Sequence, residues 1–311
     1  MSSSSSEVDR RRAEMYAKAF ASFPFERIEV RGEDALSTWR KLKAERRGTP
    51  VVLGDDDSVV NLTTAFDPLL PQKSVAEIVD ASSRVRIPDD LFARREAASA
   101  FSKAHLEKLL SGPDSELPTI ISRDDGQGFI VSFGFISGPA APAAPPRPPV
   151  GNGQRLLSPD ETRAFLAEQT PGPEIGEWPS EQPLSTGLTI ATDILTEKPA
   201  PKVDIALIPP DDWTHIPAYL RWGNWNDCPP PEMHVAALRS WRDRYGIELV
   251  GLSSDTMNLR ATTRPATRPE ALALAREQYA YCTDIIDQGV QTYSTLAASL
   301  SSDDWWYFWW D

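Results

Sequence analysis

Apolar and polar residues follow patterns that predict an α/β region in the first half of the chain. Alternation over 26–30 and an apolar run over 50–54 predict two strands, and helical spacing over 33–48 predicts a helix between them. Such a unit of strand, helix and strand favours a parallel pair of strands. Further helical patterns and extended segments complete this region, at residues 74–82, 89–111, 118–122 and 129–136.

The last third of the chain is patterned more regularly, in the order β α β β α α β. An apolar strand over 203–209 precedes a helix over 229–246 that stops at Gly246, and two strands then flank a tight turn. Two helices follow, the first of which opens with a Thr267 to Glu270 capping box. This order is close to the split βαβ arrangement of the ferredoxin-like class, a sheet with its helices on one face.

The chain ends in six consecutive aromatic residues, 305–310. In a ferredoxin-like sheet the last strand is an inner strand, and a strand that is covered on both faces has a continuous apolar sequence. We therefore expect this run to be core and to anchor its domain. An aromatic strip exposed for binding is the alternative.

Composition shifts divide the chain into four parts. Residues 1–12 are polar and of low complexity, which predicts a disordered head. Six prolines between Pro139 and Pro149 predict an extended linker, which we place at 139–200 with little regular structure apart from a short helix after Ser158. The expected domains are therefore an N-terminal α/β domain at 13–138 and a separate C-terminal domain at 201–311.

The charge and the apolar content limit the classes of partner and the compartment. Lys and Arg number 32 against 45 Asp and Glu, a net charge of -13, which argues against a surface that binds nucleic acid or an anionic membrane. No apolar run approaches the ~18–20 residues of a membrane helix or resembles a signal peptide, so we expect a cytoplasmic protein. Two cysteines are too few for a disulfide framework and are expected to be free thiols.

The densest group of polar and aromatic residues lies in a loop that enters a helix, at 221–234. Loops on a rigid scaffold commonly carry binding residues, so this loop is the predicted site. The expected binding residues are Trp222, Gly223, Asn224, Trp225, Asn226 and Glu232. No phosphate-binding, dinucleotide-binding, nucleophile-elbow or metalloprotease motif occurs in the chain, so the sequence predicts no cofactor.

Three residues of this loop are candidates for catalysis: Asp227, Cys228 and His234. A cysteine just before a helix can be a nucleophile whose thiolate is stabilised by the helix N-terminus. The prolines at 229–231 lack the N–H donors that such stabilisation needs, so a small buried cysteine is the favoured interpretation. His234 falls on the apolar stripe of its helix, and its spacing from Cys228 matches no strong zinc motif, so we predict no metal site here.

A second acidic group, Asp55, Asp56 and Asp57, follows the apolar run at 50–54. It lies at the carboxyl end of a predicted strand, where α/β folds bind ligands, and three carboxylates there suit magnesium. Helix capping by Asp57 or Ser58, with acids in the first turn, explains the same residues and is the favoured interpretation.

Residues 201–311 resemble the domain of unknown function 4253 family. The resemblance is carried by "IPAYLRWGNWNDCPPPEMHVAALRSWRDRYGIELV", by "SDT", by "RPEALALAREQYAYCTDIIDQG" and by the terminal "WWYFWWD". Two positions depart from the family pattern: Asn224 stands where a second Gly is common, and Thr283 where Pro usually follows the Cys. The resemblance implies no activity, cofactor or substrate.

Two hypotheses about function follow. The leading one is a non-catalytic binding or interaction protein, an acidic partner of a basic protein such as a toxin, because the chain is acidic and its candidate loop is rich in tryptophan. The alternative is an enzyme or small-ligand binder that uses the Trp222 to His234 loop. It predicts a pocket at the loop and a thiol that reacts quickly at neutral pH. The oligomeric state does not follow from the sequence.

Overall fold

The structure is a computed structural model, and it divides into two compact units. One unit contains the residues up to Arg94 together with Pro173–Asp311, and the other contains Arg95–Gly172. Both units mix helices and strands, which confirms the predicted α/β class. The residues described are 3–67, 69, 72–114, 117–123, 129–132, 154–168, 172–193, 196–209 and 211–311.

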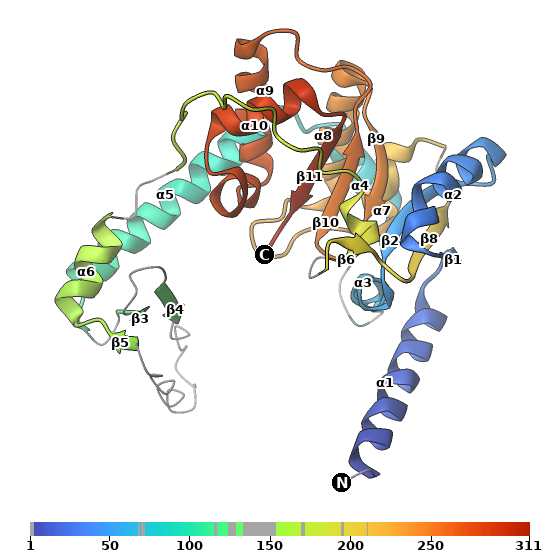
Figure 1. Ribbon diagram of the computed structural model, residues 1–311, viewed down its shortest axis with the longest axis horizontal. Helices are drawn as coiled ribbons and strands as arrows, with labels where there is room; N and C mark the ends of the chain where they lie inside the picture. Colours follow the sequence, from blue (N-terminus) through green and yellow to red (C-terminus); the bar gives the residue numbers. More distant parts are fainter. Residues whose placement is uncertain are drawn as a thin grey trace. The chain divides into compact units, whose positions relative to one another are not determined.

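The larger unit is built on a six-stranded sheet (Figure 1). Its strand order is β1-β8-β2-β9-β10-β11. β2 and β9 are parallel neighbours, and every other neighbouring pair in this sheet is antiparallel. The strands are β1 Glu26–Val30, β2 Thr49–Gly54, β8 Val203–Ile208, β9 Glu248–Leu252, β10 Thr256–Arg260 and β11 Trp305–Trp309.

This sheet joins the two regions that the sequence led us to expect as separate domains, 13–138 and 201–311. β8 lies between β1 and β2 and is antiparallel to both, with Ile205 opposite Val52. All six residues of β8 are buried, so this strand needs a hydrogen-bonding neighbour on each edge. The N-terminal strands supply both neighbours, which corrects the expected domain boundary. β1 and β2 run in the same direction, but they are not a directly paired parallel unit.

Helices cover both faces of the sheet, whereas the ferredoxin-like prediction placed them on one face. The odd-numbered residues of β8 pack in one cluster with α2 (Gly32–Glu45). The even-numbered Ala206 and Ile208 pack in another cluster with α8 (Pro231–Tyr245) and α9 (Arg268–Tyr281). Since side chains alternate between the faces of a strand, the two clusters lie on opposite sides. α2 therefore covers the face that the prediction left open.

The end of α8 and the start of α9 are those that the sequence indicates. α8 ends at Gly246, whose φ of 59° is left-handed, and α9 begins with the predicted capping box of Thr267 and Glu270. Residues from Ser3 onward lie in α1, where the sequence led us to expect a disordered head at 1–12. The other helices of the larger unit are α1 Ser3–Ser22, α3 Asp56–Thr63, α4 Val75–Ser82, α7 Ile216–Leu220, the π-helix Ile285–Val290 and α10 Tyr293–Ser302.

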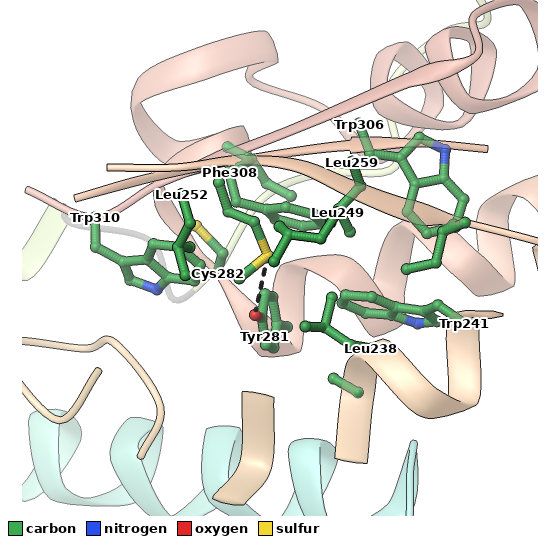
Figure 2. Close-up of a cluster of buried hydrophobic side chains, with 14 of the residues drawn as sticks. Leu238, Trp241, Leu249, Leu252, Leu259, Tyr281, Cys282, Trp306, Phe308 and Trp310 are labelled. Carbon is green, nitrogen blue, oxygen red and sulfur yellow. Dashed lines mark hydrogen bonds between the residues drawn. The ribbon is translucent and has the colours of Figure 1, made fainter. Parts of the chain in front are cut away.

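The aromatic C-terminal run forms β11, which is an edge strand and not the inner strand that we expected. Its burial therefore alternates. The core side, shown in Figure 2, carries Trp306, Phe308 and Trp310, while the other side is only partly buried. Phe308 is fully buried and stacks on Trp241, with ring centroids 5.6 Å apart. The expectation that the run contributes to the core holds for one face of the strand.

The smaller unit holds strands at the predicted segments 118–122 and 129–136, the last four residues of which lie outside the described residues. It also holds the short helix after Ser158, and the Ser158 hydroxyl accepts a hydrogen bond from the Glu161 amide. The proline-rich segment at 139–149 lies outside the described residues. The linker was expected to extend to residue 200, but residues from Pro173 onward belong to the larger unit. There the Ile190 amide donates to the buried Asn258. The elements are β3 Thr119–Arg123, β4 Phe129–Ser132, β5 Gln154–Leu156 and α6 Pro159–Glu168, with α5 Asp89–Ser111 leading into the unit.

Candidate functional site

The candidate loop connects α7 to α8 with an unusual backbone. Four of its six residues from 221 to 226 have positive φ: Arg221 at 50°, Gly223 at 112°, Asn224 at 71° and Asn226 at 43°. Left-handed backbone is costly for residues other than glycine, and such residues concentrate at functional sites. Asn tolerates this conformation better than most residues. The Asn224 that departs from the family pattern therefore meets the same backbone requirement as the usual Gly.

Gly223 is required for a second reason, which is close packing. A Cβ at this position would lie 2.2 Å from the Pro229 carbonyl oxygen and 2.7 Å from His234 Nε2. The Asn224 amide donates to the same Pro229 carbonyl at 2.9 Å, so the loop closes on itself here. Gly223 shapes the loop, and its missing side chain leaves room for the imidazole of His234.

Trp222 anchors the loop in the core. It is 2% exposed, and its Nε1 donates to the Ser253 carbonyl at 2.7 Å. Its ring makes edge-to-face contacts with Trp225 and Trp310, at centroid distances of 5.0 and 5.2 Å. Of these three tryptophans, Trp222 and Trp310 are buried and Trp225 is partly exposed.

Cys228 and His234 are brought together, but in the interior. Cys228 Sγ lies 3.4 Å from His234 Nε2, and His234 Nδ1 lies 2.5 Å from the Tyr281 hydroxyl. The Tyr281 hydroxyl in turn donates to Met257 Sδ at 3.8 Å, the contact drawn as a dashed line in Figure 2. Cys228, His234, Tyr281 and Met257 thus form a continuous series of buried contacts inside the aromatic core, which we call the relay.

Burial keeps this relay neutral. It lowers the pKa of His234 from 6.5 to about 3 and raises the pKa of the Cys228 thiol well above its usual range. Burial likewise raises the pKa of Tyr281. A thiolate paired with an imidazolium, which nucleophilic catalysis by cysteine needs, is therefore disfavoured at this position.

The other catalytic candidate points elsewhere. Asp227 forms an ion pair with Arg94, whose Nη2 lies 3.0 Å from Asp227 Oδ1 and 2.5 Å from the Asp227 carbonyl oxygen. Arg94 belongs to α5, far away in the sequence, so this contact ties the loop to a helix that the sequence did not connect with it. Cys282 is also buried, and its thiol donates to the Trp309 carbonyl at 2.9 Å.

A cleft of about 1030 Å³ lies at the loop. Five of the six expected binding residues line it, while the sixth, Asn226, instead donates from Nδ2 to the Asp311 carbonyl at 2.8 Å. Further lining comes from α3 and the turn after it, from the segment before α4, from Ile78 of α4, from Leu220 of α7, from the prolines before Glu232 and from the turn between β9 and β10. The polar lining residues outside the predicted loop are Asn61, Thr64, Gln72, Lys73, Ser254 and Asp255, and Arg221 lines the cleft from the first position of the loop.

The charges of the cleft are arranged unevenly. Lys73 Nζ lies 2.6 Å from Glu232 Oε1, while Glu232 Oε2 is buried and has no hydrogen-bond partner among the described residues. The Arg221 guanidinium lies over the Phe66 ring, 5.3 Å from its centroid. Asp255 is exposed on the turn that forms the opposite lining.

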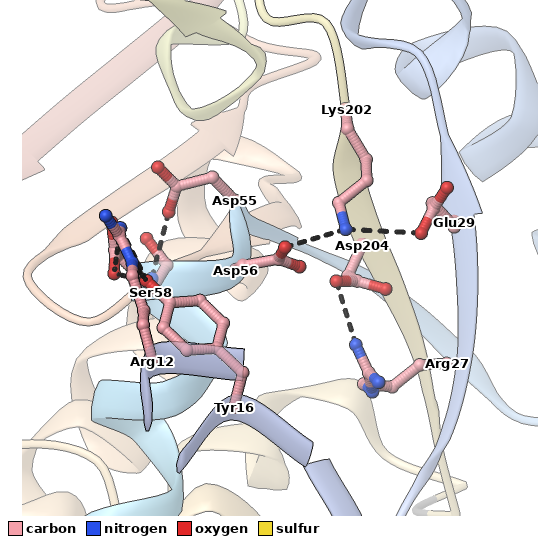
Figure 3. Close-up of polar contacts among 10 residues, drawn as sticks. Arg12, Tyr16, Arg27, Glu29, Asp55, Asp56, Ser58, Lys202 and Asp204 are labelled. Carbon is pink, nitrogen blue, oxygen red and sulfur yellow. Dashed lines mark hydrogen bonds and ion pairs between the residues drawn. The ribbon is translucent and has the colours of Figure 1, made fainter. Parts of the chain in front are cut away.

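The three aspartates after β2, Asp55, Asp56 and Asp57, contact different partners (Figure 3). Asp55 is the N-cap of α3, where it accepts from the Ser58 amide, so capping is confirmed with Asp55 in place of Asp57 or Ser58. Asp56 pairs with Lys202 at 2.7 Å. Among the residues that the structure describes, no three His, Cys, Asp or Glu side chains are grouped so that they could hold a metal ion.

Neighbouring Asp204 is almost fully buried, and burial raises its pKa even though Arg27 Nη1 lies 2.9 Å from Oδ2. Since Lys202 also contacts Glu29, at 3.3 Å, the charges here form a network that joins β1, α3 and β8. The network stabilises the junction between the N-terminal and C-terminal strands, and we assign it no ligand.

Comparison with known proteins identifies only the C-terminal region. No curated protein and no solved structure matches the chain significantly. Within the described ranges, no helix combines the length and the apolar character that a membrane crossing requires. Residues 204–311 match the model of the family described as Domain of unknown function (DUF4253), and this part of the chain is therefore a DUF4253 domain.

Proposed function

We propose that this chain is a non-catalytic binding protein that contacts another protein through the cleft beside the Trp222 to Glu232 loop. One observation carries the proposal: the loop presents Asn224, Trp225 and Glu232 at a cleft, while its reactive groups are buried and neutral. Such a division suits recognition better than chemistry, because a nucleophile must reach its substrate.

The shape of the loop supports the same proposal. Trp225 rests on the buried Trp222, which is fixed by its hydrogen bond to Ser253. A tryptophan held in place loses little entropy on binding, and tryptophans are common among residues that dominate interface energies. The net charge of -13 favours a basic partner through long-range attraction.

The test is native mass spectrometry of the full-length protein after gentle recovery from its own source cells. We expect a discrete protein adduct that disappears in Trp225→Ala, with binding weaker by about 2 kcal/mol or more. Trp178→Ala is the matched control, since Trp178 is also a partly exposed tryptophan but does not line the cleft. A protein adduct that both variants retain would contradict the proposal. A small-molecule adduct that is lost in Trp225→Ala would contradict it too and would show that the cleft binds a small ligand.

A further inference from the structure

Only one of the two carboxylate oxygens of Glu232 has a hydrogen-bond partner among the described residues. Its side chain is 17% exposed, Oε1 accepts from Lys73, and Oε2 is buried without a partner among the described residues. A buried charged oxygen that lacks a hydrogen-bond donor is destabilising. Glu232 lines the cleft, so its carboxylate becomes available to another cationic donor when Lys73 moves away.

Lys73 shows which chemistry this carboxylate accepts, and it is a weakly held partner. Its side chain is 57% exposed, three times the exposure of Glu232. Ion pairs in which a flexible lysine remains largely in solvent contribute little to stability. Because Lys73 precedes α4 in a connecting segment, it can leave the carboxylate without disturbing a helix.

The rest of the cleft suits a cation as well. Its charged residues are Lys73, Arg221, Glu232 and Asp255, and the guanidinium of Arg221 is already placed over the Phe66 ring. When Lys73 moves out, the remaining three charges give the cleft a net charge of -1. Trp225 adds a partly exposed indole, and a cation that meets both an indole and a carboxylate gains from both contacts.

We infer that the cleft accepts an arginine or lysine side chain of the partner protein, which displaces Lys73 and donates to Glu232 while it packs against Trp225. This inference rests on the proposed function and deepens it, because it names the chemistry of the partner. The partner would present a basic residue on an extended segment or a loop tip that can enter the cleft.

The experiment titrates the full-length protein with the probe peptide acetyl-Gly-Arg-Gly-amide and follows the indole NMR signal of Trp225, assigned from Trp225→Phe. We expect saturable binding that is roughly tenfold or more weaker when citrulline replaces arginine, because citrulline has nearly the same shape without the charge. Glu232→Gln should lose a similar factor, whereas Glu45→Gln, an equal charge change on the exposed end of α2, should not.

Lys73→Met provides a second variant that leaves the carboxylate intact. It should bind the arginine peptide several-fold more tightly, while Lys41→Met, an exposed lysine of α2, should not. Failure of Lys73→Met to strengthen binding, or equal affinity for the arginine and citrulline peptides, would overturn the inference. Agmatine binding more tightly than the peptide would assign the cleft to a small free cation and would also overturn it.

The failure of this inference is distinguishable from the failure of the proposed function. If Trp225→Ala loses the partner protein but Glu232→Gln retains it with unchanged affinity, the cleft binds a protein without using a cation at Glu232. If neither variant affects the partner protein, the proposed function itself is wrong. Thermal unfolding of each variant is measured beside the titration, so that a folding defect is recognised.

Discussion

The DUF4253 domain should not fold when it is cut out of this chain. The family match begins at Asp204, within β8, and so omits both N-terminal strands. β2 lies between β8 and β9, two strands of the matched region. A fragment of residues 201–311 would therefore have a gap in the middle of its own sheet, with unpaired backbone groups on each side.

The magnitude of the defect follows from the burial of β2. Val51, Val52 and Leu53 are each 0% exposed, and they contribute to the clusters on both faces of the sheet. Burial of one such side chain contributes about 1.5–3 kcal/mol, so the three together contribute about 5–9 kcal/mol. Folded proteins are stable by only about 5–15 kcal/mol, so the fragment should be unfolded.

The amide NMR spectrum measures this directly. The fragment 201–311 alone should give poorly dispersed signals, whereas residues 173–311 mixed with residues 3–94 as a separate chain should give a dispersed spectrum. A chain in which a short flexible linker replaces Arg95–Gly172 keeps all six strands and is the positive control. A well-dispersed spectrum from the fragment alone would refute the reasoning, because β8 and β9 would then pair without β2.

Four further predictions concern the core and the loop. Phe308→Ala should lower the free energy of unfolding by about 3–5 kcal/mol in urea titrations, and Tyr307→Ala, on the partly buried face of the same strand, should lower it clearly less; equal losses would argue against the alternating burial of β11. Gly223→Ala should lower the melting temperature, since its Cβ would meet backbone at 2.2 Å, and an unchanged melting curve would contradict the loop geometry. Folding lowers the pKa of His234 from 6.5 to about 3, so the unfolded chain takes up a proton there that the folded chain does not; stability should fall as the pH drops from 6.5 towards 3, and His234→Gln should show a shallower fall. Cys228 should react with iodoacetamide more slowly than a model thiol at neutral pH, and a faster reaction would restore the catalytic interpretation.

The candidate site could be predicted in part because its loop is local. The density of tryptophan and polar residues indicated the segment from Trp222 to Glu232, and five of the six binding residues expected there line a cleft. Lys73 and Asp255 could not be predicted, because they come from distant segments and neither stands out in the sequence. The alternating burial of the aromatic run could not be predicted either. Both faces of β11 carry aromatic residues, so the sequence does not show which face is in the core.

The sequence by itself determined the local structure of this protein: the helix ends at Gly246 and Thr267, the apolar strands and the site loop. These features depend on backbone preferences and on hydrogen bonds within a few residues. Tertiary structure decided which strands are neighbours, that β8 separates β1 from β2, and that Cys228 meets His234 in a neutral interior. A buried strand is apolar whichever strand lies beside it, so its sequence specifies burial without specifying the partner.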